Sequence, residues 1–179
     1  MNHDSRIRVS PTAFIDPLAL RVEDVKPELV ARTLAREARF SGMPEKFLSV
    51  AEHSLMVARL LARRYPNTYP MLPLFGLTHD AAEGLGFRDL SSPVKHAPQL
   101  LGYRDAIFAA QAVAYEALVG RQPTATEGAF IGWADRFAYE VEAACVWGGG
   151  GLAFLEPQDA EVEWLDVYWE MKGDLEEGE

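Results

Sequence analysis

The sequence predicts an all-α protein folded as a single bundle of five or six helices. Apolar residues recur at the 3.6-residue period of an α-helix in almost every patterned segment, and capping residues precede several of these segments. The chain has 179 residues, of which 49% are hydrophobic, and this suits one domain with a full core. We therefore expect an irregular segment over 1–26 with a short strand or hairpin near 7–15, a bundle over 27–173, and a solvated acidic tail over 174–179.

Start and stop signals divide the bundle into six expected helices. Proline opens the first helix, expected over 27–40, and a glycine and a proline follow its end. A capping box of Ser49 with Glu52 opens the second helix, expected over 49–65. The remaining helices are expected at 71–83, 103–119, 124–147 and after Pro157. The apolar stripe expected on the last helix consists of Val162, Leu165 and Trp169.

Charge and composition exclude several classes of protein. The net charge of −10 argues against binding to a nucleic-acid polymer, which usually requires a basic surface. The single cysteine, Cys145, rules out a disulfide within the chain and a cysteine-based zinc site. No apolar run reaches the ~18–20 residues that cross a bilayer, and the first residues lack the apolar segment of a signal peptide. We expect a cytoplasmic protein without a membrane partner.

Ionisable side chains interrupt the apolar pattern of three helices. The segment FGLTHDAAEGLG, Phe75–Gly86, places His79 and Asp80 inside an expected helix, while His53 and Asp135 lie on the apolar faces of two others. Two imidazoles and two carboxylates form a mixed nitrogen and oxygen set that suits a divalent transition metal or Mg²⁺. A histidine on an apolar face is more often a hydrogen-bonded core residue, and an aspartate can cap a helix or pair with an arginine. Spacing alone therefore leaves a structural role open.

The motifs SVAEHS, HDAAE and WAD occur in this order, and together they resemble the HD-domain phosphohydrolase superfamily. The longer stretches RFSGMPEKFLSVAEHSLMVARLL and HDAAEGLGFRDLSSPVK are similar to the small 5′-deoxynucleotidase-like members, including phage-type members and phage dATP triphosphohydrolases. The similarity covers roughly residues 28–170. It implies an HD-domain helical bundle and a metal-dependent phosphohydrolase that acts on 2′-deoxyribonucleotides, either 5′-monophosphates or triphosphates, through a metal-activated water.

The resemblance also implies roles for individual residues. It implies that one divalent ion, of a type that the sequence leaves open, is held by His53, His79, Asp80 and Asp135. Glu83 would position or deprotonate the attacking water, and Asp89 would contact the sugar hydroxyl. From sequence alone, Glu83 also fits a surface residue at a helix end, and Asp89 fits a turn.

Three further residues resemble the substrate contacts of the family. Arg39 and Lys95 would contact phosphate, and Phe40 would press on the sugar and disfavour a 2′-hydroxyl. Lys95 fits a solvated lysine equally well, and Phe40 fits a residue that closes the core. Met43 stands where relatives often have histidine, so neither the base nor the number of phosphates is carried over.

Two other functions remain open at this stage. One is a catalytically weak nucleotide sensor on the same scaffold, and the other is a di-iron oxygenase. The oxygenase would need additional histidines, and only His3 and His96 remain. We expect the protein to form a dimer or larger homo-oligomer, with apolar surface near Trp164 and Trp169.

Overall fold

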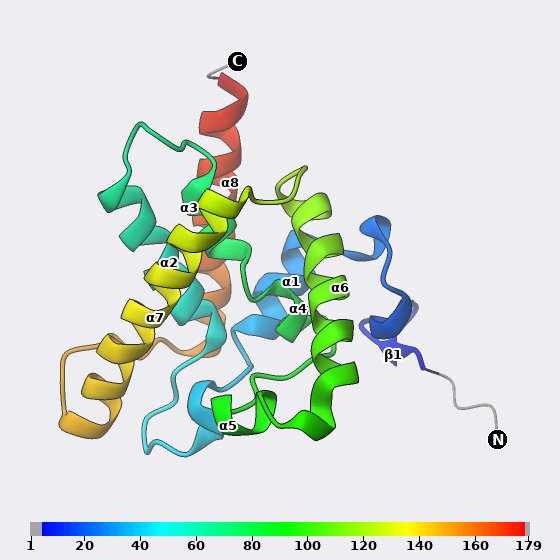
Figure 1. The fold of residues 1–179 in the computed structure, drawn as a ribbon, viewed down its shortest axis with the longest axis horizontal. Coiled ribbons are helices and arrows are strands. Elements are labelled where there is room, and N and C mark those ends of the chain that lie inside the picture. The colour runs from blue at the N-terminus through cyan, green and yellow to red at the C-terminus, as the bar shows by residue number, and fades with distance from the viewer. Residues whose placement is uncertain (1–4, 178–179) are drawn as a thin grey trace.

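The computed structural model describes residues 5–177, and these are mostly helical, in agreement with the predicted all-α class (Figure 1). The strands and α-helices are β1 (Ile7–Arg8), β2 (Phe14–Ile15), α1 (Pro27–Leu34), α2 (Val50–Arg64), α3 (Leu72–Thr78), α4 (Ala81–Gly84), α5 (Ser92–Lys95), α6 (Leu101–Leu118), α7 (Ala125–Gly148) and α8 (Pro157–Glu177). Strands β1 and β2 pair antiparallel and form the hairpin expected near the N-terminus. None of the described helices is long and apolar enough to cross a membrane.

Helix α2 is the central element of the bundle and packs most extensively against α3, with further contacts to α7 and α8. It begins as expected: Ser49 Oγ accepts a hydrogen bond from the Glu52 amide, and the Glu52 carboxylate accepts one from the Ser49 amide. Gly76 allows α3 to approach α2 closely, because a Cβ there would lie 2.6 Å from Leu61 Cδ1 and 3.3 Å from Val57 Cγ1. This approach brings the end of α3 beside the buried face of α2.

The first helix is shorter than expected, since α1 ends at Leu34 and not near residue 40. The chain turns back toward α2 there, because the Arg39 amide donates to the Leu48 carbonyl at 2.8 Å and Ala38 forms a β-bridge with Ser49. The following turn contains two non-glycine residues with left-handed backbone, Phe40 and Ser41, both at φ 54°. Such conformations are costly and persist only where the surroundings enforce them.

Two expectations about side chains of the C-terminal helix are wrong, and the helix is longer than expected. Its buried stripe consists of Ala160, Trp164 and Tyr168, whereas Val162 and Trp169 are more than half exposed. Trp164 is fully buried against the core and therefore cannot belong to an exposed apolar surface. The helix also continues to Glu177, through most of the segment expected to be a solvated tail, and 178–179 lie outside the described residues.

Candidate metal centre

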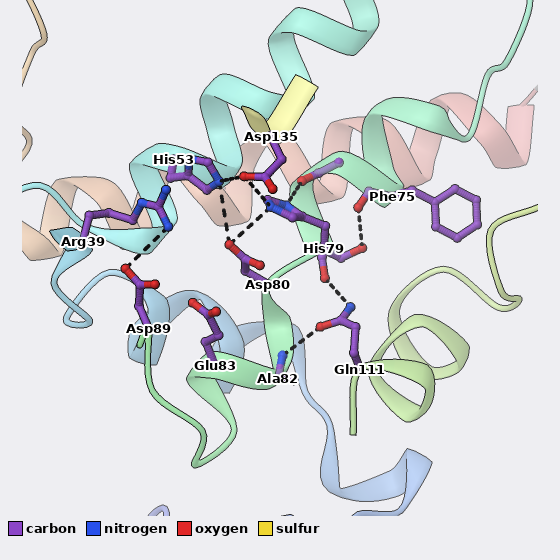
Figure 2. Close-up of polar contacts among 12 residues, drawn as sticks. Arg39, His53, Phe75, His79, Asp80, Ala82, Glu83, Asp89, Gln111 and Asp135 are labelled. Carbon is purple, nitrogen blue, oxygen red and sulfur yellow. Dashed lines mark hydrogen bonds and ion pairs between the residues drawn. The ribbon is translucent and has the colours of Figure 1, made fainter. Parts of the chain in front are cut away.

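The four residues predicted to bind metal lie together (Figure 2). His53 comes from α2, His79 and Asp80 follow α3, and Asp135 comes from α7. His53 Nε2 lies 3.1 Å from Asp135 Oδ1 and 3.7 Å from Asp80 Oδ2, while His79 Nε2 lies 3.2 Å from Asp80 Oδ2. One ligand atom from each of His53, His79 and Asp80 falls within 4.8 Å of the others. Asp135, whose side chain is 47% exposed, lies at the open side of this group.

Both imidazoles are held with Nε2 facing the centre. His53 Nδ1 lies 2.8 Å from Glu142 Oε1, and His79 Nδ1 lies 2.8 Å from the Gly76 carbonyl oxygen. These acceptors favour the proton on Nδ1, which leaves Nε2 as the electron-pair donor that a metal requires. Each Nε2 atom is buried and lacks a well-aligned hydrogen-bond partner among the described residues. The donor set therefore fits a divalent cation.

The electrostatics of the cluster also favour a cation. Burial disfavours the charged form of His79, but the carboxylates of Asp80 and Asp135 outweigh it and raise the pKa of His79 to about 9. Burial likewise opposes ionisation of Asp80, yet His79 and His53 hold the pKa of Asp80 well below its usual range. The carboxylates thus favour positive charge at the imidazoles, which a bound divalent ion would supply in place of protons.

The sequence predicted that His79 and Asp80 lie in mid-helix, and this is wrong. They form the break between α3 and α4. In a continuous helix the Ala82 amide would donate to the Thr78 carbonyl. Here the side chain of Gln111 on α6 is inserted between them: its Nε2 donates to the Thr78 carbonyl at 2.8 Å, and its Oε1 accepts from the Ala82 amide at 3.0 Å (Figure 2). The carboxamide replaces the missing backbone bond and stabilises the break.

Replacing Gln111 with leucine should weaken metal binding without abolishing folding. The substitution leaves the Thr78 carbonyl and the Ala82 amide unpaired or allows them to bond to each other, and either change moves His79 and Asp80. We expect a loss of roughly 10- to 100-fold in metal affinity, the usual effect of removing an outer contact to ligands. Isothermal titration with Mn²⁺ measures it, with Gln158→Leu at the exposed start of α8 as the control. Wild-type affinity in Gln111→Leu would show that the break does not depend on this side chain.

Glu83 and Lys95 lie on one side of the cluster. Lys95 Nζ donates to Glu83 Oε1 at 2.9 Å, while Glu83 Oε2 is buried without a hydrogen-bond partner among the described residues. Burial, together with the charge of Asp80, raises the pKa of Glu83 to about 8, although Lys95 opposes the shift. A cavity of about 90 Å³ lies between these two residues, His79 and α6. Glu83 is therefore a buried carboxylate facing space beside the cluster, and not the surface residue that its helix-end position also allowed.

Arg39 and Asp89 lie on another side of the cluster. Arg39 is almost buried; its Nη2 lies 3.2 Å from Glu142 Oε2 and its Nη1 lies 3.5 Å from Asp89 Oδ2. Burial raises the pKa of Asp89, which Arg39 partly offsets. Phe40, the next residue, packs against Tyr139 at 5.5 Å and Trp147 at 6.5 Å between ring centroids. The predicted catalytic and substrate-binding residues thus lie around the metal cluster, with Phe40 next to Arg39 in sequence. The others are Glu83, Asp89, Arg39 and Lys95.

Glu142 is the important residue that the sequence did not single out as functional. It is fully buried on α7 and its two oxygens contact His53 and Arg39 separately. A signal existed, because Glu142 lies two helical turns after Asp135 on the same apolar face. An acidic residue in that position requires a buried cationic or hydrogen-bonding partner.

No protein-family model matches the chain. An uncharacterized protein of Rhodobacter capsulatus is 39% identical over 86 residues, which is 47% of this chain. The chain spans 42% of that relative's length, so the similarity is limited to part of both proteins. Function must therefore be inferred from the chemistry of the site.

Proposed function

We propose that the protein is a metal-dependent phosphohydrolase of the HD-domain type that acts on 2′-deoxyribonucleotides. The observation that supports this most directly is that the buried Nε2 atoms of His53 and His79 face the carboxylates of Asp80 and Asp135 and form no well-aligned hydrogen bond among the described residues. A divalent cation would bind both nitrogens and both carboxylates, and would replace the protons that otherwise hold these groups together. The motif resemblance and the surrounding acidic and basic groups extend this metal site to a phosphohydrolase.

A divalent ion bound there would polarise a phosphoryl oxygen and make a water molecule more acidic. Glu83 lies beside this position, its Oε2 has no hydrogen-bond partner among the described residues, and it accepts the proton of the attacking water in the proposed reaction. Its pKa of about 8 arises largely from burial and from the charge of Asp80. With a cation held by Asp80, that charge would be offset and the pKa of Glu83 would fall toward neutrality, where a general base is most effective.

Arg39 and Lys95 supply positive charge on two sides of the cluster. The Arg39 guanidinium is fixed by Glu142 and Asp89, and its planar donors suit phosphate oxygens. The Lys95 side chain is 30% exposed, and its ammonium can donate to a second oxygen while it holds Glu83. Asp89 would accept a hydrogen bond from a sugar hydroxyl of the substrate. These groups would orient the substrate and stabilise charge that develops on it.

Malachite-green detection of phosphate release is the decisive experiment, across deoxynucleoside mono- and triphosphates with Mn²⁺, Co²⁺ and Mg²⁺. Triphosphates require a second assay in which added pyrophosphatase or tripolyphosphatase converts released polyphosphate to phosphate. Hydrolysis of any member supports the proposal. Nucleotide binding without turnover in the whole panel would replace it with the alternative of a sensor on the same scaffold.

A di-iron oxygenase gains no support from the described residues. The metal group found among them contains His53, His79 and Asp80 and no third histidine, and His3 lies outside the described residues. Homo-oligomer formation remains a prediction. Because Trp164 is buried, we propose that another apolar surface contributes to self-association. It contains Trp133 and Phe137 on α7, which stack on each other and are more than 40% exposed.

Replacing Phe40 with alanine should reduce discrimination against ribonucleotides. Among the described residues, its ring packs against Tyr139 and Trp147 rather than against the buried core, which favours a role at the substrate over core closure. Burying a 2′-hydroxyl without a partner costs about 1–3 kcal/mol, or roughly 5- to 150-fold in selectivity. The ratio of kcat/KM for a matched deoxy and ribo pair measures the effect. An unchanged ratio with a lower Tm would assign Phe40 to structure alone.

A further inference from the structure

Another hollow shares Glu83 with the cavity beside the metal centre. It has a volume of about 520 Å³ and is bounded by β1, by α1 and by the segment that follows α4. Its lining includes Glu37, Glu83 and four arginines: Arg8, Arg32, Arg36 and Arg88. We call this hollow the arginine pocket. Its volume is within the range of about 300–1,000 Å³ typical of small-molecule sites.

Three of the four guanidinium groups are fixed by hydrogen bonds, and the fourth, that of Arg8, lies over the Phe14 ring at 5.1 Å from its centroid. Arg32 Nη2 donates to the Val9 carbonyl at 2.9 Å, and Arg36 Nη1 donates to the Arg32 carbonyl at 2.7 Å. Arg36 Nη1 also pairs with Glu161 on α8, and Arg88 Nη1 pairs with Glu37. In the part of the chain that the structure describes, these contacts use one of the three nitrogens of each group. The other nitrogens remain as donors on side chains that are already ordered.

The charge of the pocket is opposite to that of the whole protein. The chain has a net charge of −10, yet four of its 17 basic residues line this one hollow. Glu37 pairs with Arg88, Glu161 pairs with Arg36, and Glu83 accepts from Lys95, so Arg8 and Arg32 are left without a carboxylate partner among the described residues. Clustered guanidinium groups of this kind bind phosphate oxygens, often in bidentate fashion.

We infer that the arginine pocket binds the phosphate chain of a polyphosphate anion, at a site separate from the metal centre. The chain can belong to inorganic polyphosphate or to a nucleoside triphosphate. Glu83 is shared by the pocket and the cavity beside the metal centre, and Arg88 adjoins Asp89 in sequence. An anion held by Arg88 therefore lies next to the elements that carry two of the proposed catalytic groups.

Isothermal titration with inorganic tripolyphosphate, in EDTA, tests this inference. The protein used carries Asp80→Ala, which removes the proposed metal site, so the result does not depend on whether the protein is a hydrolase. We expect saturable one-to-one binding that weakens at least tenfold when Arg8→Glu or Arg88→Glu is added, because both side chains are exposed and reversal of their charge leaves the core intact. Arg63→Glu, an equal change in charge on the exposed face of α2, should leave the affinity within twofold.

A parallel titration with dATP identifies the source of the phosphate chain. Binding of tripolyphosphate and dATP with similar affinity assigns recognition to the phosphates alone, whereas binding of dATP only assigns it to the whole nucleotide. No saturable binding of either ligand at millimolar concentration would overturn the inference. Equal weakening by Arg63→Glu would also overturn it, since the attraction would then be nonspecific.

Discussion

Replacing Asp80 with alanine should abolish both metal binding and hydrolysis while the protein stays folded. Asp80 Oδ2 lies near both imidazoles, at 3.2 Å from His79 Nε2 and 3.7 Å from His53 Nε2. Its loss removes a ligand and a negative charge from the site. We expect metal affinity to fall by more than the roughly 10- to 100-fold seen when an outer contact is removed. Elemental analysis of the purified variant and a malachite-green assay measure the two effects.

The fold should survive this change, because the buried apolar core of α2, α3 and α8 does not include Asp80. Circular dichroism and thermal melting provide the check. Asp166→Ala, on an exposed part of α8, is the matched control and should retain full metal content and turnover. Stoichiometric metal and wild-type activity in Asp80→Ala would show that the ion, if any, binds elsewhere.

Replacing Glu83 with glutamine should reduce kcat by on the order of 10²–10⁴, the range typical of a general acid–base group. The amide has nearly the same shape and can still accept from Lys95, but it cannot take a proton from water. Because Glu83 is not part of the group that fits the ion, metal content should remain near the wild-type value. The exposed Glu116→Gln on α6 is the control.

The two measurements together distinguish three roles for Glu83. Low kcat with full metal content supports action on water. Loss of metal would make Glu83 a ligand, and unchanged kcat with altered stability would limit it to its ion pair with Lys95. The comparison must be made at saturating metal, so that a weakened site does not resemble a lost base.

Most of the helices could be predicted because their signals are local. The capping box at Ser49 and the apolar period of α2 and α7 lie within the segments that they specify. The break between α3 and α4 could not be predicted this way, because it is stabilised by Gln111, 29 residues after Ala82. The early end of α1 has a similar cause, since the pairing of Ala38 with Ser49 lies outside the helix.

The same difference between local and distant causes applies to the site. His53, His79, Asp80 and Asp135 stood out because each is an ionisable residue on an apolar face. Their grouping depends on the packing of α2, α3 and α7, which spacing alone does not determine. Only the three-dimensional structure shows that Asp89 and Glu142 hold Arg39. It also shows that Glu142 contacts Arg39 with one oxygen and His53 with the other.

Glu142 has a consequence for how the site assembles. Its carboxylate joins His53 to Arg39, and it stands on α7, whereas both partners belong to the N-terminal part of the chain. A partly unfolded form in which α7 has detached would therefore lose metal affinity and phosphate affinity in a single event. Ion and substrate would each favour the attached form, so the two binding equilibria are linked through one local unfolding transition. Proteases should therefore cleave within α7 most slowly when the metal ion and the substrate are both bound.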